Sequence, residues 1–357
     1  MTTRTTPRIG LFGIALGMIV FFGLSGKSQA QQVDLNAAAE AKAEAGREAR
    51  SRPVTDPPGP KAAGTFITFD APAAGTAGGQ GTFRASISPA GVITGYYTDA
   101  NFVSHGFLRA SNGAITAFDV PGGTFTFPFG INPPKTITGL YAYINDPNLV
   151  VHGFLRTSFG TLTTFDAPGS CTSCFVLGTF PSSINPTGVI TGAYTDASVV
   201  VHGFLRARDG SFTTFDATGA GTDSSQGTQP VVINPEGAIL GIFTDGNNVN
   251  HGFLRANDGT FTTFDPPGQI SGGSFFLFSS APFSFGPDLA MNPAGVITGT
   301  YFQLISGNPF GGNFRVFVRA TDGTFTTFDA VMFPNGNPGM NIPCCTWSFP
   351  SGITPSG

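Results

Sequence analysis

The segment His202-Gly203-Phe204-Leu205-Arg206 decides the fold, because it occurs four times in the chain. The four copies start at His105, His152, His202 and His251. Successive copies lie 47, 50 and 49 residues apart, and a fifth copy has diverged to Arg315-Val316-Phe317-Val318-Arg319. A period of about 20–50 residues is typical of a solenoid, a propeller or another array. The sequence therefore predicts a single repeat domain.

The third repeat predicts four short β-strands separated by proline and glycine clusters. The expected strands are 182–186, 189–196, 201–207 and 211–216, which are rich in Thr, Val, Ile, Tyr and Phe. Four antiparallel strands in 40–50 residues are typical of a propeller blade. A parallel β-solenoid is the alternative, but its coils are shorter and need no tight Asp-Gly hairpin. We therefore expect an all-β fold, a β-propeller of four-stranded blades with five complete repeats.

The turn Asn257-Asp258-Gly259 fixes the register of the last hairpin in its repeat. A three-residue loop with glycine in the left-handed conformation pairs Arg255 with Phe261, so the guanidinium is expected to cover that ring. The same register gives five cross-strand pairs: His105 with Asp119, His152 with Asp166, His202 with Asp216, His251 with Asp265, and Arg315 with Asp329. Each pair joins a cationic or protonatable side chain to an aspartate.

These pairs are predicted to be structural rather than catalytic. An adjacent His and Asp form half of a catalytic triad. Five equivalent copies are better explained as a clamp that recurs once per blade, and Arg315 keeps the ion pair while it cannot act as a base at neutral pH. We assign no catalytic, cofactor-binding or metal-binding residue and expect no cofactor.

A second recurring strand, Ile-Thr-Gly-x-Tyr-Thr-Asp, ends at Asp99 and Asp196, and more loosely at Asp245. Capping of the strand end is one interpretation of these aspartates, and calcium binding is the other. No calcium-loop spacing supports the second. The glycines of this strand, such as Gly192, are expected to let a neighbouring blade's aromatic ring approach closely.

The four cysteines predict disulfides in an exported protein. Cys171 and Cys174 form a C-x-x-C, and Cys344 and Cys345 are adjacent. Both pairs fall between the last strand of one repeat and the first of the next, which favours two local bridges. A redox role would need a helix N-terminus to lower the thiol pKa, and the spacing is weak evidence for zinc.

The N-terminal part differs from the repeats in composition. Residues 1–30 have a basic start, an apolar run and a small-x-small cleavage site, so we expect a signal peptide. Residues 31–64 are helix-prone and then Pro-rich, and we interpret them as a linker to the repeat domain at 65–357. That domain has nine basic and sixteen acidic residues, which argues against nucleic acid and anionic membranes as partners. We expect no membrane insertion after signal cleavage.

The two ends of the repeat region predict an incomplete sixth blade. Residues 65–70 match only a fourth strand, and residues 351–357 match only a first strand and its corner. A propeller commonly closes its ring with strands from both termini, because closure removes unpaired edges. The hypothesis is a shared sixth blade that lacks its middle strands, with self-association through the open blade edges.

The unit Ile-Asn-Pro-x-Gly-x-Ile-x-Gly followed by His-Gly-Phe-Leu-Arg resembles the HAF-type extracellular repeat. The match is clearest at 184–192 and 202–206, and it departs where Gly203 and Arg206 replace the Ala and Trp of that pattern. The resemblance implies export and a propeller-like β fold, and it carries no catalytic residues over.

We therefore expect a secreted, periplasmic or cell-surface protein. The first hypothesis is a non-enzymatic propeller that binds a glycan, a peptide or a cell-surface partner through its variable connections. The alternatives are a carbohydrate-active lyase or hydrolase that uses the central channel, and a structural envelope or matrix protein. The sequence has no G-x-S-x-G, no H-E-x-x-H and no paired carboxylates outside the repeat phase, so an enzyme is the weaker interpretation.

Overall fold

A computed structural model of the chain describes residues 67–143, 145–175, 177–267, 289–304 and 312–329. The predictions for the signal peptide, the linker, Cys344, Cys345 and residues 351–357 therefore lie outside the described residues. The chain divides into two units, Met1–Ile67 and Thr68–Gly357, and the second contains all the strands discussed below.

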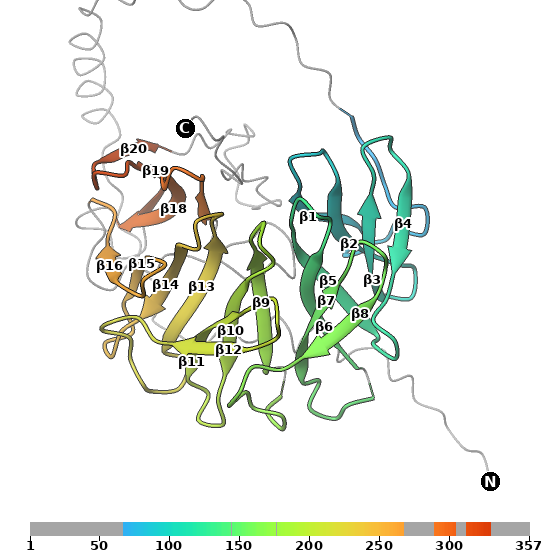
Figure 1. Cartoon of the computed structure of the whole chain (residues 1–357), viewed down its shortest axis with the longest axis horizontal. Helices are drawn as coiled ribbons and strands as arrows, with labels where there is room; N and C mark the ends of the chain where they lie inside the picture. Colours follow the sequence, from blue (N-terminus) through green and yellow to red (C-terminus); the bar gives the residue numbers. More distant parts are fainter. Residues whose placement is uncertain (1–66, 144, 176, 268–288, 305–311, 330–357) are drawn as a thin grey trace, which may run out of the picture. The chain divides into compact units, whose positions relative to one another are not determined.

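The second unit is an all-β propeller whose described strands form five four-stranded blades (Figure 1). Blade 1 contains β1 (Gly81–Ile87), β2 (Ile93–Thr98), β3 (Ser104–Arg109) and β4 (Ile115–Phe118). Blade 2 contains β5 (Phe125–Ile131), β6 (Ile137–Ala142), β7 (Val151–Arg156) and β8 (Leu162–Phe165). Blade 3 contains β9 (Thr179–Ile184), β10 (Ile190–Thr195), β11 (Val201–Arg206) and β12 (Phe212–Phe215). Blade 4 contains β13 (Gly227–Ile233), β14 (Ile239–Thr244), β15 (Asn250–Arg255) and β16 (Phe261–Phe264), and blade 5 contains β17 (Leu289–Met291), β18 (Ile297–Leu304), β19 (Gly312–Arg319) and β20 (Phe325–Asp329).

Each blade is an antiparallel meander in the predicted register. In blade 4, Arg255 pairs with Phe261 and Gly252 with Phe264, as the hairpin count requires. A single parallel pair joins one blade to the next, from the start of the third strand to the start of the following first strand. These pairs are Ser104 with Phe125, Val151 with Gly178, and Val201 with Gly227. The first strands of successive blades also pack against one another, so they form the inner part of the propeller.

The core of each blade is an aromatic ring on the third strand that packs over a glycine on the second. The rings of Phe107, Phe154, Phe204, Phe253 and Phe317 are fully buried. In blade 3, a Cβ at Gly192 would lie 2.8 Å from the ring of Phe204 and would also overlap the backbone oxygen of Phe180. The glycine therefore makes room for the ring and the first strand of its own blade. The prediction that it lets a ring of the neighbouring blade approach was wrong.

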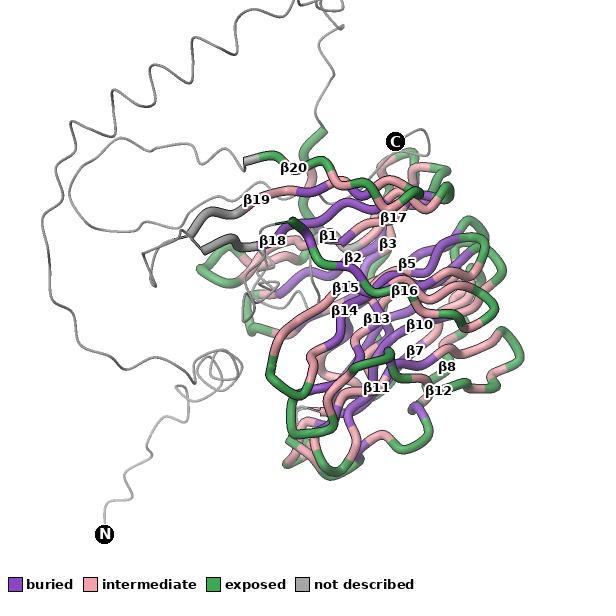
Figure 2. The backbone as a smooth tube through the Cα atoms, turned by 90° about the vertical axis from the view of Figure 1, so that its left-hand side faces the viewer, coloured by how far each residue is buried: buried purple, intermediate pink, exposed green. Residues whose placement is uncertain are grey.

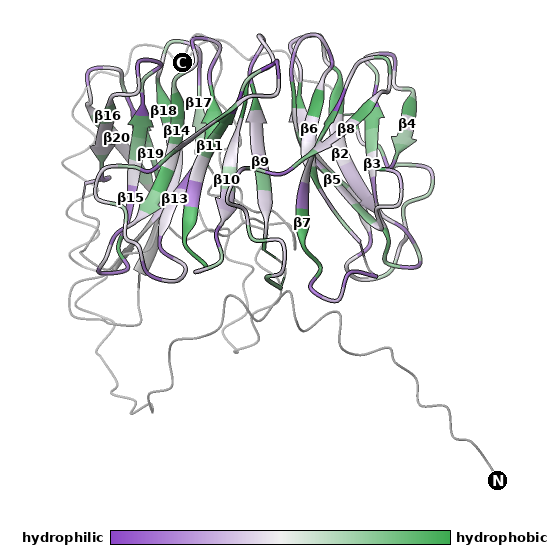
Figure 3. Ribbon diagram, turned by 60° about the horizontal axis from the view of Figure 1, so that its bottom comes forward, coloured by the Kyte–Doolittle hydropathy of each residue, from purple (hydrophilic) through white to green (hydrophobic). Residues whose placement is uncertain are grey.

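Burial is greatest on the second strands of the blades and least on the outer, fourth strands (Figure 2). Every residue of β6 and β10 is buried, whereas the outer strand β8 has two exposed threonines between two partly buried residues. Apolar colours follow the strands and hydrophilic colours follow the loops that join them (Figure 3). Most of the polar groups that could serve a function therefore lie at the blade ends and at breaks in the apolar pattern.

Candidate binding site

Each blade has two distinct ends, because its strands alternate in direction. The loop between the second and third strands and the connection to the next blade lie at one end, which we call the connection end. In blades 1 to 4 it comprises residues 99–103, 119–124, 146–150, 166–178, 196–200, 216–226 and 245–249, with the aspartate that follows β16. The turns between the first and second strands and between the third and fourth strands lie at the opposite end, which we call the turn end.

Histidine–aspartate pairs occupy the connection end of blades 1 to 4. The ring Nδ1 of His202 lies 3.0 Å from Asp216 Oδ1, and the other three pairs have distances of 2.9–3.0 Å. Arg315 and Asp329 are register partners in blade 5, as predicted. Each histidine also stacks on an aromatic ring of the second strand, for example His202 on Tyr194 at 5.1 Å. The hydrogen bond to Asp166 raises the pKa of His152, although burial acts in the opposite direction.

The aspartates at the end of the second strand cap the loop that follows them. Asp196 Oδ1 accepts hydrogen bonds from the backbone N–H groups of Ser198 and Val200, both at 2.9 Å. Its Oδ2 faces His202 Nε2 at 3.6 Å. Asp99 and Asp245 make the same contacts in their blades. Their oxygens serve the loop and the histidine, and the described residues contain no group of three or more His, Cys, Asp or Glu side chains arranged to hold a metal ion.

The arginine that ends the third strand makes its closest aromatic contact across the blade boundary. The guanidinium carbon of Arg255 lies 4.9 Å from the ring centre of Phe215 in blade 3 and 5.9 Å from Phe261 in its own hairpin. Arg109 covers Phe69 at 4.7 Å in the same manner, although residues 67–70 form no strand. The predicted contact between Arg255 and Phe261 is present. The closer contact with Phe215 was not predicted, because a hairpin register carries no information about the neighbouring blade.

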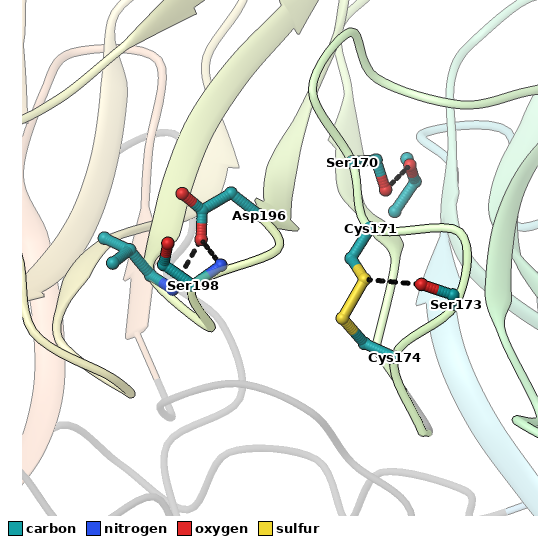
Figure 4. Close-up of a disulfide and its surroundings, with 8 residues drawn as sticks. Ser170, Cys171, Ser173, Cys174, Asp196 and Ser198 are labelled. Atoms are coloured by element: carbon teal, nitrogen blue, oxygen red, sulfur yellow. Dashed lines mark hydrogen bonds between the residues drawn. A yellow bond between two sulfur atoms is a disulfide. The ribbon is translucent and has the colours of Figure 1, made fainter.

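A disulfide closes the connection between blades 2 and 3. Cys171 and Cys174 are bonded, with their Cα atoms 5.7 Å apart, and the loop lies beside the second-to-third-strand loop of blade 3 (Figure 4). Cys171 Sγ is 3.9 Å from Ser173 Oγ. Of the four cysteines considered for local bridges, this pair is the one that the described residues include.

A pocket of about 150 Å³ lies at the connection end between blades 3 and 4. Its polar lining comes from Ser225, Gln226, Gln229, Thr244 and Asn250. Val201, Gly227, Ile242 and Phe243 complete the lining. None of these side chains is ionisable in the physiological range, so the pocket presents amides, hydroxyls and apolar groups only.

The pocket exists because blade 4 departs from the repeat. Gln229 pairs with Ile242 at a position where the three preceding blades have Phe83, Phe127 and Phe180. Those three phenylalanines belong to one aromatic cluster, in which Phe83 stacks on Tyr96 at 4.9 Å. A glutamine at the same position interrupts this cluster with a carboxamide.

Gly227 is the ordinary residue of its position, since Gly81 and Gly178 stand there in blades 1 and 3, and Phe125 of blade 2 is the exception. The substitution of Gln229 for phenylalanine is therefore the change that replaces aromatic packing by a polar lining. The signal was present in the sequence, where Phe127-Pro128, Phe180-Pro181 and Gln229-Pro230 occupy the same repeat phase. The recurring positions of the repeat do not reveal this site, because it lies at a position where one blade departs from them.

Ser225, at the rim of this pocket, has a φ of 70°, in the left-handed region that non-glycine residues rarely adopt. Val199 and Asn248 have φ angles of 65° and 62°, but Phe102 and Leu149 are also left-handed at the same loop position of blades 1 and 2, so this conformation belongs to the repeat. Ser225 N–H donates to the carbonyl of Val199 at 2.8 Å, and Gln226 Nε2 donates to Asn248 Oδ1 at 3.1 Å. Gln226 Oε1 in turn accepts the N–H of Asp223. These bonds hold the pocket's rim in a fixed conformation.

Within the described part of the chain, no helix is long and apolar enough to cross a membrane. A scan of known protein families and a search of curated proteins both found no match, so the HAF-type resemblance stays a prediction. Solved structures with a similar fold include a fungal lectin, described as a six-bladed β-propeller from Aleuria aurantia with a novel fucose recognition mode. It has 15% identity and a TM-score of 0.42, and the match covers 72% of this chain and 80% of that one. A mutant of the same lectin in complex with alpha-methyl-L-fucoside has 14% identity and a TM-score of 0.42, with 75% and 80% covered.

Proposed function

We propose that this protein is an exported, non-enzymatic propeller that binds a neutral glycan in the pocket between blades 3 and 4. The observation that carries the proposal is Gln229, which replaces the phenylalanine of the three preceding blades and lines a cavity. A carboxamide offers both a donor and an acceptor, which is the combination that sugar hydroxyls need.

The rest of the lining supports a neutral, hydroxylated ligand. Asn250 and Thr244 add polar groups, and Thr244 Oγ1 lies 2.7 Å from Asn250 Oδ1, so both side chains are already oriented. Ile242 and Phe243 supply apolar surface for the less polar face of a sugar ring. A charged ligand would find no counter-ion among the lining residues.

The same lining favours binding over catalysis. General acid–base chemistry and covalent catalysis need His, Asp, Glu, Lys, Cys or an activated hydroxyl. The lining contains none of the ionisable types, and its one serine, Ser225, lies on the strained rim beside amides. The size of the pocket fits one small ring rather than a drug-sized molecule.

Export is supported by the disulfide between Cys171 and Cys174, because such bonds persist in oxidising compartments. The predicted signal peptide at 1–30 agrees with this location. Both features would place the pocket where extracellular glycans are accessible.

A glycan array probed with the purified chain and with the variant Gln229→Phe tests the proposal. Neutral glycans, including L-fucosides, are expected to be retained by the natural chain and lost from the variant, which restores the residue of the other blades. Asp258→Asn, at the turn end, is the matched control and should bind like the natural chain. Equal glycan binding by the natural chain and by Gln229→Phe would contradict the proposed site, and turnover of a bound glycan would contradict the non-enzymatic assignment.

A further inference from the structure

Blade 2 departs from the repeat at two adjacent turns of the turn end. The turn after the first strand places Gly91, Gly188, Gly237 and Gly295 in the left-handed conformation in the other four blades. Blade 2 has Lys135 there, with a φ of 64°. Its N–H donates to the Asn132 carbonyl at 2.8 Å, as the glycines do in their turns, so the turn is the same and the side chain is the difference.

The second departure is Phe159, in the turn between β7 and β8. The other blades have an Asx residue there whose side-chain oxygen accepts a backbone N–H two residues on, as Asp209 does from Ser211 at 2.9 Å. In blade 2 that role passes to Thr157 Oγ1, which accepts the N–H of Thr161. The ring of Phe159 is left 97% exposed, more than any other large apolar side chain of the described residues.

The two departures lie side by side. Ile137 pairs with Arg156, so Lys135 and Ser158 face each other one turn beyond the strands. The equivalent residues touch in blade 3, where a Cβ on Gly188 would meet the side chain of Arg208. We call the exposed residues Pro133, Pro134, Lys135 and Phe159 the blade 2 turn patch. It combines an exposed ring with the one lysine of residues 65–357.

The charge of the two blade ends is opposite. In blades 1 to 4, the loops and connections of the connection end contain no lysine or arginine. Their aspartates are Asp99, Asp119, Asp146, Asp166, Asp196, Asp216, Asp223, Asp245 and Asp265. In the same blades, the turn end has Lys135, Arg208 and the four arginines that close the third strands, against the acidic residues Asp209, Glu236 and Asp258, so its net charge is positive. Exposed aromatic rings occur at both ends, since Phe102 and Phe175 of the connection end are 57% and 50% exposed.

We infer that the blade 2 turn patch docks on the acidic connection end of a second copy of this chain. Lys135 faces the partner's carboxylates, and Phe159 packs on an exposed ring. Opposite charges favour this orientation over like ends, which would repel. The two docking surfaces differ, so the contact is heterologous and continues beyond a dimer. The patch lies at the opposite end of the blades from the pocket, whereas the acceptor surface shares the connection end with it. The association needs no glycan, so failure of this inference and failure of the proposed function are distinguishable.

Sedimentation velocity of the full chain over a wide concentration range, at low and at high salt, tests the inference. Association is expected to grow with concentration without stopping at a dimer, and to weaken in high salt, because surface charge attraction is screened. Lys135→Gly and Phe159→Asp restore the residues of the other blades, so both should remain folded. Each is expected to weaken association at least tenfold, and the double variant to abolish it.

Asp209→Asn in blade 3 keeps the turn acceptor and should associate like the natural chain. Phe102→Asn, a residue that tolerates the left-handed conformation at that position, tests the acceptor end and should also weaken association. A chain that remains monomeric at all concentrations would overturn the inference. Association that ignores salt and survives the double variant would also overturn it, and would indicate another contact.

Discussion

The junction between blades 1 and 2 and the junction between blades 3 and 4 use the same repeat positions for different purposes. At the first junction Phe125 and Phe127 pack with Tyr96, and Tyr96 and Phe127 meet edge to face at 4.8 Å. At the second junction Gly227 and Gln229 occupy those two positions and line a pocket. The repeat therefore supplies a scaffold, and a local departure from it supplies a site.

Truncation of a buried ring at the junction between blades 1 and 2 should have the largest effect on the free energy of unfolding. Phe127 is 8% exposed, so Phe127→Ala should remove buried apolar surface and leave a cavity. We expect a loss of about 3–5 kcal/mol in the free energy of unfolding. Gln229→Ala should change it by less than about 0.5 kcal/mol, because a partly exposed carboxamide makes little packing. Chemical denaturation of both variants measures this difference. Equal losses of unfolding free energy in the two variants would contradict the prediction.

Exchanging the residues of the two junctions, as Phe127→Gln and Gln229→Phe, should have the next largest effect on stability. Phe127→Gln puts a carboxamide into an apolar cluster and should destabilise the fold by about 2–4 kcal/mol. Gln229→Phe puts the repeat's own residue into open space and should leave the melting temperature almost unchanged. Thermal unfolding of the two variants measures the asymmetry. A strongly destabilised Gln229→Phe would mean that the glutamine is structural.

Tyr96 is the one buried polar side chain of the aromatic junction whose hydroxyl lacks a hydrogen-bond partner among the described residues. It is 3% exposed. Burial raises the pKa of this phenol, as expected for a group removed from water. Tyr96→Phe should therefore stabilise the protein by about 1 kcal/mol. Tyr301→Phe is the control, since Tyr301 donates to the Pro267 carbonyl at 3.1 Å, and this variant should lose a similar amount.

The smallest effect concerns His152, at the connection end of blade 2. The hydrogen bond to Asp166 raises its pKa in the folded protein, so the folded state binds the proton more tightly than the unfolded state. The resulting stabilisation is fully present below the unfolded pKa and is lost as the pH rises through the folded pKa. An NMR titration of the natural chain and of Asp166→Asn measures it. A His152 pKa that does not fall in Asp166→Asn would contradict the assigned cause.

The sequence predicted the blade architecture well because the repeat constrains it five times over. The register that placed Arg255 opposite Phe261 came from one turn, and the structure has the same register. The closer partner of Arg255, Phe215, was not predicted, because contact between blades depends on how sheets pack and not on pairing within one sheet. The pocket was missed for a related reason, since Gln229 has meaning only when it is compared with Phe127 and Phe180 in space.

We propose that the departure from the repeat at Gln229 creates the ligand site. A crystal structure of the chain with a neutral glycan from the array tests this most directly. We predict a sugar ring between blades 3 and 4, with its hydroxyls within hydrogen-bond distance of the Gln229 and Asn250 side chains. A glycan bound at another junction or at the turn end, with the pocket beside Gln229 unchanged, would contradict the claim.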